Sequence, residues 1–132
     1  MNALLNAALS HIWPRIQSLS DMKTPDDSLG RDFTIDDVGH DAVRIATAAG
    51  SLITIQRAAF MAALRYLVEN GHGASSPCEI RSNQVAEESG PLCLIARAAN
   101  SNTRVINYIV PILARLGILG VGGTRPNTTW LI

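Results

Sequence analysis

Cysteine, aromatic residues and net charge are all scarce in this sequence. Its two cysteines, Cys78 and Cys93, are too few for a disulfide framework and lack metal-site spacing, so we interpret both as small buried residues in a reducing compartment. No apolar run approaches the roughly 18 residues of a membrane span. The start of the chain also lacks the basic stretch and cleavage site of a signal peptide. We therefore expect a cytoplasmic protein that does not contact a membrane.

The formal net charge is zero, but the two halves of the chain differ in sign. Residues 1–55 carry four basic and seven acidic side chains, whereas residues 56–132 carry seven basic and four acidic ones. This asymmetry favours an acidic partner for the second half. The 132 residues, 47% of them hydrophobic, are enough to bury one ordinary core.

The first half of the chain is predicted to be helical. Residues 20–32 indicate a loop, and residues 33–50 a helix capped by Thr34, with Asp36 and Asp37 in its first turn and Gly50 at its end. Before the loop, a helix kinked near Pro14 carries an apolar stripe, which we interpret as a homodimer contact or, alternatively, as part of the monomer's core. The stripe consists of Leu5, Leu9, Ile12, Ile16 and Leu19.

The second half is predicted to mix helices with short strands. A long helix over residues 103–116 should bury one apolar stripe and turn Arg104, Asn107, Tyr108, Pro111 and Arg115 outward. The buried stripe consists of Val105, Ile109, Ile112, Leu113 and Leu116. The other expected elements are a helix over 52–70 capped by Ser51, a strand over 78–81, a short helix after Ser82, a helix over 92–99, a polar turn over 100–102, and a hairpin of strands 118–121 and 128–132.

The stretch "LIARAANSNTRVINYIVPILARLGILGVGGTRPNTTWLI" resembles the winged helix-turn-helix family of DNA-binding domains. Ala96 matches the small residue where two helices cross, residues 100–102 match the turn, and Val105 and Ile109 match buried positions of the recognition helix. "LARLGIL" matches the exit into the wing, whereas Pro111 is a departure that should bend the helix. We assign the first helix of the motif to residues 92–99, with "SNQVAEESG" as the alternative. The expected fold is mainly α (α+β), with an N-terminal helical segment (1–50) followed by a winged helix-turn-helix domain with a small hairpin wing (51–132).

This resemblance implies a double-stranded DNA-binding protein, such as a small transcriptional regulator. Arg104 and Asn107 are residue types that pair with base edges in the major groove, and Arg125 lies at the expected wing tip. The alternatives are a DNA-recognition subunit of a replication or restriction system, and a protein-binding adaptor without nucleic acid. The full set of expected DNA-binding residues is Ser101, Asn102, Thr103, Arg104, Asn107, Tyr108, Arg115 and Arg125.

No enzyme is indicated. Asp36 with His40, and Asp37 with Asp41, have the spacing of neighbours on a helix and could form half a metal site. We favour the simpler interpretation, a helix start stabilised by acidic residues and followed by a solvated histidine. We therefore expect no catalytic residue, no metal and no cofactor.

Overall fold

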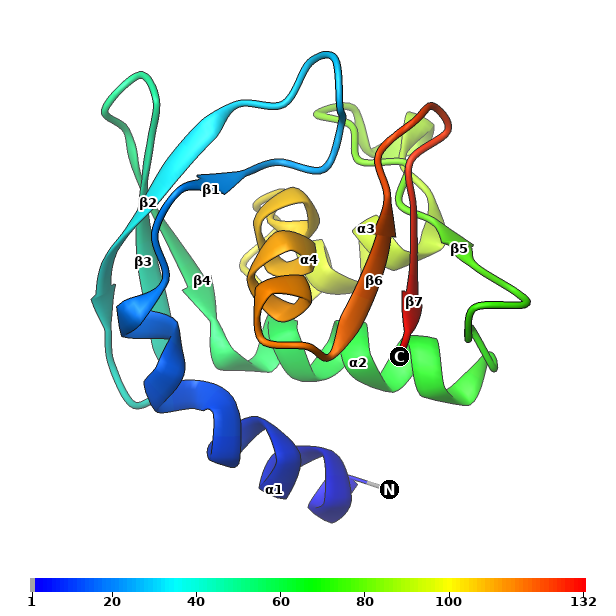
Figure 1. Ribbon diagram of the computed structural model, residues 1–132, viewed down its shortest axis with the longest axis horizontal. Helices are drawn as coiled ribbons and strands as arrows, with labels where there is room; N and C mark the ends of the chain where they lie inside the picture. Colours follow the sequence, from blue (N-terminus) through cyan, green and yellow to red (C-terminus); the bar gives the residue numbers. More distant parts are fainter. Residues whose placement is uncertain (1) are drawn as a thin grey trace.

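Strands occupy most of residues 33–50, where the sequence analysis predicted a helix. In the computed structural model, which describes residues 2–132, four antiparallel strands lie in the order β1-β2-β3-β4 (Figure 1). β-branched residues are frequent in β2, β3 and β4, and one face of the sheet is buried, as expected for strands that cover a core. The expected fold class is wrong, because the chain is α+β and four strands precede its third helical segment, α2. The strands are β1 (Met22–Lys23), β2 (Asp32–Val38), β3 (Ala42–Thr47) and β4 (Leu52–Gln56).

The residues that suggested a helix over 33–50 have other roles. Thr34 lies within β2 and caps nothing. Asp36 stands at a β-bulge and accepts a hydrogen bond from Nε of Arg44 on the neighbouring strand at 2.5 Å. Gly50 has a φ of +88° in the turn between β3 and β4, a conformation that favours glycine. The residues of 33–50 that resemble the start and end of a helix therefore lie in the strands and turns of β-hairpins.

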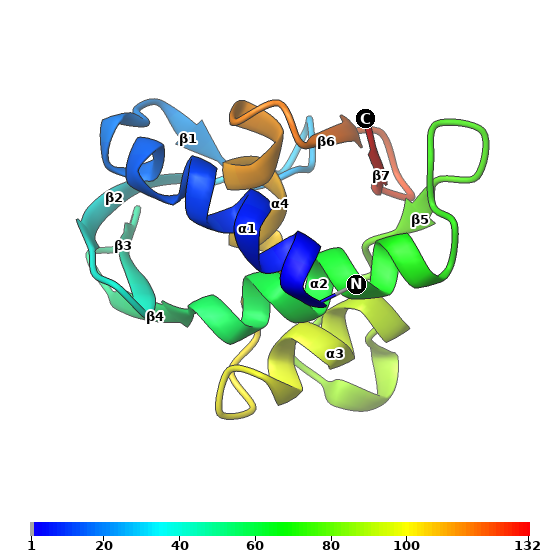
Figure 2. The same cartoon turned by 90° about the horizontal axis from the view of Figure 1, so that it is seen from below.

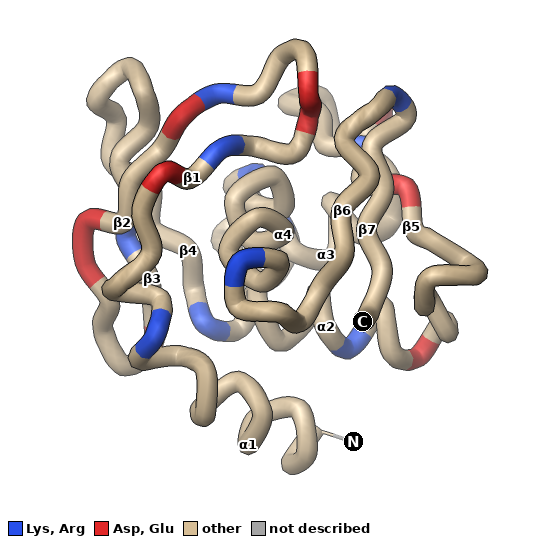
Figure 3. The backbone as a smooth tube through the Cα atoms, viewed as in Figure 1, with Lys and Arg blue, Asp and Glu red and all other residues tan. Residues whose placement is uncertain are grey.

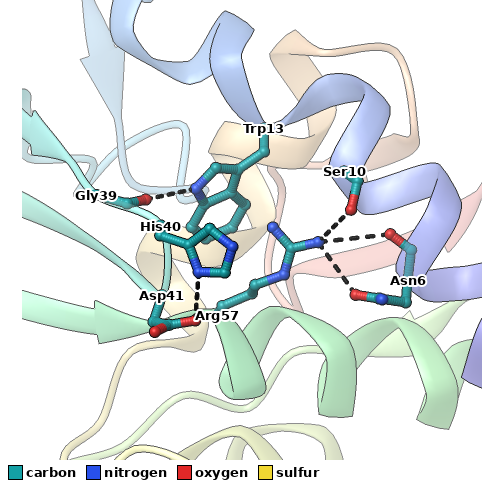
Figure 4. Close-up of polar contacts among 7 residues, drawn as sticks. All are labelled: Asn6, Ser10, Trp13, Gly39, His40, Asp41 and Arg57. Atoms are coloured by element: carbon teal, nitrogen blue, oxygen red, sulfur yellow. Dashed lines mark hydrogen bonds and ion pairs between the residues drawn. The ribbon is translucent and has the colours of Figure 1, made fainter.

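The N-terminal helices pack on the body of the molecule (Figure 2). They are α1 (Asn2–Ile12) and the 3-10 helix η1 (Trp13–Ser18). Trp13 Nε1 donates to the Gly39 carbonyl at 2.7 Å, and the Arg57 guanidinium lies 5.0 Å from the Trp13 ring and donates to Ser10 Oγ at 2.6 Å (Figure 4). The apolar stripe faces inward, with three of its members buried and two partly buried. The stripe is thus part of the core of a single chain and does not support a homodimer contact. The homodimer itself stays a prediction.

The second half begins with α2 and ends in a three-stranded sheet of order β5-β7-β6. The predicted hairpin and the predicted helix over 92–99 are confirmed, and Ser101 and Asn102 form a left-handed turn with φ values of 53° and 58°. Residues 52–56, predicted as helix, are β4, and the helix predicted after Ser82 is a three-residue 3-10 turn. The elements are α2 (Arg57–Glu69), β5 (Cys78–Glu79), η2 (Ala86–Glu88), α3 (Pro91–Ala98), α4 (Ile106–Arg115), β6 (Leu119–Gly122) and β7 (Thr128–Leu131).

Helix α4 lies in the centre of the molecule, between the two sheets (Figure 1). It begins at Ile106, three residues later than predicted, so Thr103 and Arg104 precede it. Pro111, expected on the outward side, is buried. Tyr108 packs edge-on against Phe33 of β2 with ring centroids 5.2 Å apart, and Arg115 Nη1 donates to the Ser20 carbonyl at 2.9 Å. The first sheet and the segment before β1 therefore cover much of the polar side of α4, which was expected to contact DNA.

Asn100 joins the turn before α4 to strand β4. Its side chain is 3% exposed, accepts from the Gln56 N–H at 2.7 Å and donates to the Thr54 carbonyl at 3.1 Å. We expect Asn100→Ala to lower the free energy of unfolding by about 1–3 kcal/mol, because it leaves two partly buried backbone groups without partners. Urea unfolding would measure this, with the exposed Gln17→Ala as control. Equal losses in the two variants would contradict this role.

Candidate functional site

One groove, with a volume of about 870 Å³, collects polar side chains from five separate segments. Its walls are the loop between β1 and β2, the turn between β3 and β4, the loop after β5, the start of α4 and the tip of the β6–β7 hairpin. Figure 1 shows the β1–β2 loop arching towards that hairpin tip. The groove therefore lies where the two halves of the chain meet.

Arginines dominate the charge around this groove. Arg31, Arg81 and Arg104 line it, and within residues 2–132 their side chains form no ion pair and donate no hydrogen bond. A fourth arginine, Arg125 at the hairpin tip, is paired with Asp26. Figure 3 shows basic positions on both the β1–β2 loop and the hairpin tip, with acidic positions along the same loop. Three guanidinium groups are thus available to an anionic ligand.

The loop between β1 and β2 is tied to the hairpin tip. Asp26, with a side chain 13% exposed, accepts from Arg125 Nε at 2.8 Å and from the N–H groups of Leu29 and Ser28 at 2.7 and 2.9 Å. The Asp27 N–H donates to the Gly123 carbonyl at 2.9 Å. A side chain at position 123 would collide with the Asp27 carboxylate. These contacts fix one wall of the groove.

The same contacts hold the pKa of Asp26 well below its ordinary value of 3.8, with the Arg125 hydrogen bond as the largest cause and the bond from Leu29 next. Because the folded pKa lies below the unfolded one, this contribution to stability is complete above about pH 5, where the unfolded carboxyl is also ionised, and it falls as the pH is lowered further. We expect Asp26→Asn to lose less stability than the wild type between about pH 5 and pH 3. Urea unfolding at each pH tests this, with the exposed Asp32→Asn as control. Parallel wild-type and Asp26→Asn curves would contradict the contact.

Two polar atoms at the groove have no partner. Ser82 Oγ and Asn107 Oδ1 are buried without a hydrogen bond in the described part of the chain, and both residues line the groove. A buried polar atom without a partner is costly, so a ligand or an ordered water that reaches either atom would be stabilised there.

The loop after β5 is held in a strained shape beside these atoms. Arg81 has a φ of +42°, and its side chain packs on Gly90, where an added Cβ would lie 2.8 Å from Arg81 Cβ. Arg97 of α3 is 5% exposed and donates to the Asn83 carbonyl at 2.6 Å. A non-glycine residue in the left-handed region is kept there by its surroundings, and such strain clusters at functional sites.

The expected DNA-binding residues fall into three groups. Arg104, Asn107, Tyr108 and Arg125 line the groove together. Ser101, Asn102 and Thr103 were expected where the N-terminal donors of the helix could hold phosphate, but they lie on the exposed turn before α4, outside the helix. Arg115 lies in the last turn of α4, away from the groove. Four further residues reach the groove from distant segments and were not predicted from the sequence: Arg31, Arg81, Ser82 and Asn83.

The acidic and histidine residues that suggested half a metal site are not arranged as a helix would place them. Because residues 36–41 are not helical, Asp36 and His40 are not neighbours on a helix face. His40 Nδ1 instead lies 2.9 Å from Asp41 Oδ1, and both side chains are largely exposed (Figure 4). No group of three potential metal ligands occurs among the described residues. The groove is therefore the stronger candidate site.

Both cysteines are buried and unpaired. No helix in residues 2–132 has the length and apolar character needed to span a bilayer. Comparison with protein family models, with curated proteins and with solved structures found no match to this chain. Its function must therefore be inferred from its own residues.

Proposed function

We propose that this chain binds nucleic acid, DNA in the first instance, at the arginine-lined groove. The observation that carries the proposal is the convergence of Arg31, Arg81 and Arg104, three unpaired guanidinium groups from three different segments. Guanidinium groups bind phosphate through paired N–H donors, and phosphate contacts supply most non-specific affinity for nucleic acid. The neutral net charge does not oppose this, because the basic side chains gather locally.

The contact surface differs from the one first expected. Arg104 keeps its proposed role, whereas Tyr108 and Arg115 are engaged within the chain. The relation of residues 94–132 to winged helix-turn-helix proteins remains a proposal. It is supported by the left-handed turn at Ser101 and Asn102 between α3 and α4, and by the hairpin that follows α4. Both a transcriptional regulator and the DNA-recognition subunit of a larger system could use the arginine-lined groove in this way. A cytoplasmic location is part of the proposal, and the two unpaired cysteines support it.

Fluorescence anisotropy tests the proposal directly. Labelled DNA of mixed sequence, single-stranded and duplex, is titrated with the full chain at several salt concentrations. We expect binding at micromolar protein that weakens as salt rises, because phosphate contacts release counterions. Absence of salt-sensitive binding to either form would refute nucleic-acid binding and leave the protein-binding alternative.

A further inference from the structure

The position of α4 limits which nucleic acid can enter the groove. Reading a duplex through the major groove requires a helix or a two-stranded ribbon that can be inserted into it. Here Tyr108 packs against Phe33 of β2, and Arg115 is bound to the carbonyl of Ser20. Because β1 and β2 cover this side of α4, the helix has no free face long enough to enter a duplex groove.

The groove itself has the size and lining of a site for one small polar ligand. Its volume of about 870 Å³ lies within the usual range for organic ligands. The Leu29 side chain, 59% exposed, provides an apolar wall, and Ser82 and Asn107 provide the two atoms that lack partners. Both atoms are covered by neighbouring groups, so a ligand reaches them only when the partly exposed side chains rotate. Rotation about the Cβ–Cγ bond lets the Asn107 amide present either its oxygen or its nitrogen to a base edge, and rotation about the Cα–Cβ bond turns the Ser82 hydroxyl outward.

Phosphate groups would be held next to these atoms. Arg81 belongs to the same loop as Ser82, and Arg104 precedes Asn107 by less than one helical turn. The loop and the start of α4 thus each carry one guanidinium and one unpartnered polar atom. An unpaired nucleotide combines an anionic phosphate with a base whose hydrogen-bonding edge is exposed, whereas paired bases have that edge occupied.

We propose that the groove receives an unpaired nucleotide of a single strand, with its phosphates at Arg81 and Arg104 and its base edge at Ser82 and Asn107. This inference rests on the proposed function and narrows its ligand from nucleic acid in general to unpaired strands. It also gives a role to Ser82 Oγ and Asn107 Oδ1, the two buried atoms without partners. Binding of a phosphate alone would not require these two atoms.

The first test compares strands of one sequence. Anisotropy is measured with a labelled DNA strand of about 20 nucleotides, the same strand as RNA, and the blunt DNA duplex, at about 0.1 M salt. We expect a single strand to bind at least about 10-fold more tightly than the duplex. The DNA and RNA strands show which sugar is preferred, and either preference supports the inference. Equal or tighter duplex binding would overturn it and leave the proposed function intact, whereas no binding by any form would refute both.

The second test removes the proposed base contacts without changing charge. We expect Ser82→Ala and Asn107→Leu each to weaken single-strand binding by roughly 5- to 10-fold with the salt slope unchanged. Duplex binding should stay the same, and the melting temperature should stay equal or rise, because each substitution removes an unsatisfied polar atom. If Asn107→Leu lowers the melting temperature, Ser82→Ala decides the test. Unchanged single-strand affinity in the folded variant would overturn the base contact.

Discussion

Replacing Arg81 and Arg104 together by glutamine should lower the affinity for a single strand on the order of 100-fold. Each guanidinium lost from a phosphate contact removes about 1.5 kcal/mol, the lower end for hydrogen bonds to charged groups, because both side chains are at least partly exposed. The slope of log affinity against log salt should fall by about 1.4, since each contact with a single strand contributes about 0.7. Anisotropy titrations at several salt concentrations measure both quantities.

A matched control separates this effect from a general loss of positive charge. Arg15 is exposed on η1 and does not line the groove, so Arg15→Gln should change affinity and salt slope little. The melting temperature of the double variant should stay close to that of the wild type, because neither guanidinium has a partner within the described residues. An equal loss of affinity in Arg15→Gln would mean that nucleic acid is attracted without using the groove.

Phe60→Ala should have the largest effect on stability. Phe60 is fully buried in α2 and meets the Trp13 ring edge-on with centroids 5.1 Å apart, so it joins the N-terminal helices to the core. Its truncation removes transfer energy and leaves a cavity, together about 3–5 kcal/mol. Urea unfolding measures the loss, with Leu4→Ala, 75% exposed, as the control. A loss below about 1 kcal/mol would show that α1 and η1 are not packed as described.

Elements fixed by local patterns could be predicted from the sequence. The apolar stripe from Val105 to Leu116 gave α4, and the punctuation around Pro126 and Asn127 gave the β6–β7 hairpin. The turn at Ser101 and Asn102 followed from the tolerance of asparagine for left-handed backbone. These signals lie within a few residues of the structures they specify.

Residues 33–50 could not be predicted in the same way. Thr34, Asp36 and Asp37 have the composition of a helix start, and Gly50 that of a helix end. The secondary structure of this stretch is determined instead by pairing with distant strands, since Val43 and Ile45 of β3 are buried between partners on β2 and β4. Local propensity is a weak guide when tertiary packing can bury an alternating pattern.

The site was predictable only where its residues are close in sequence or belong to one motif. Arg104 and Arg125 were identified because the resemblance placed them on the recognition helix and the wing tip. Arg31 and Arg81 were missed because they reach the groove through the first sheet and the loop after β5, whose positions depend on the whole fold. The first sheet also covers the polar side of α4, which was expected to contact DNA bases. Because the sheet itself was not predicted, the sequence could not show that this side is covered.

The most direct test of a nucleic-acid site in the groove is the mapping of amide chemical shifts during titration with a single DNA strand. We predict that the largest changes cluster at the β1–β2 loop, residues 80–83, the start of α4 and the hairpin tip, together with the side-chain amide of Asn107. Changes confined to the exposed turn at residues 101–103 and to α3, or spread evenly over the surface, would contradict binding in the groove.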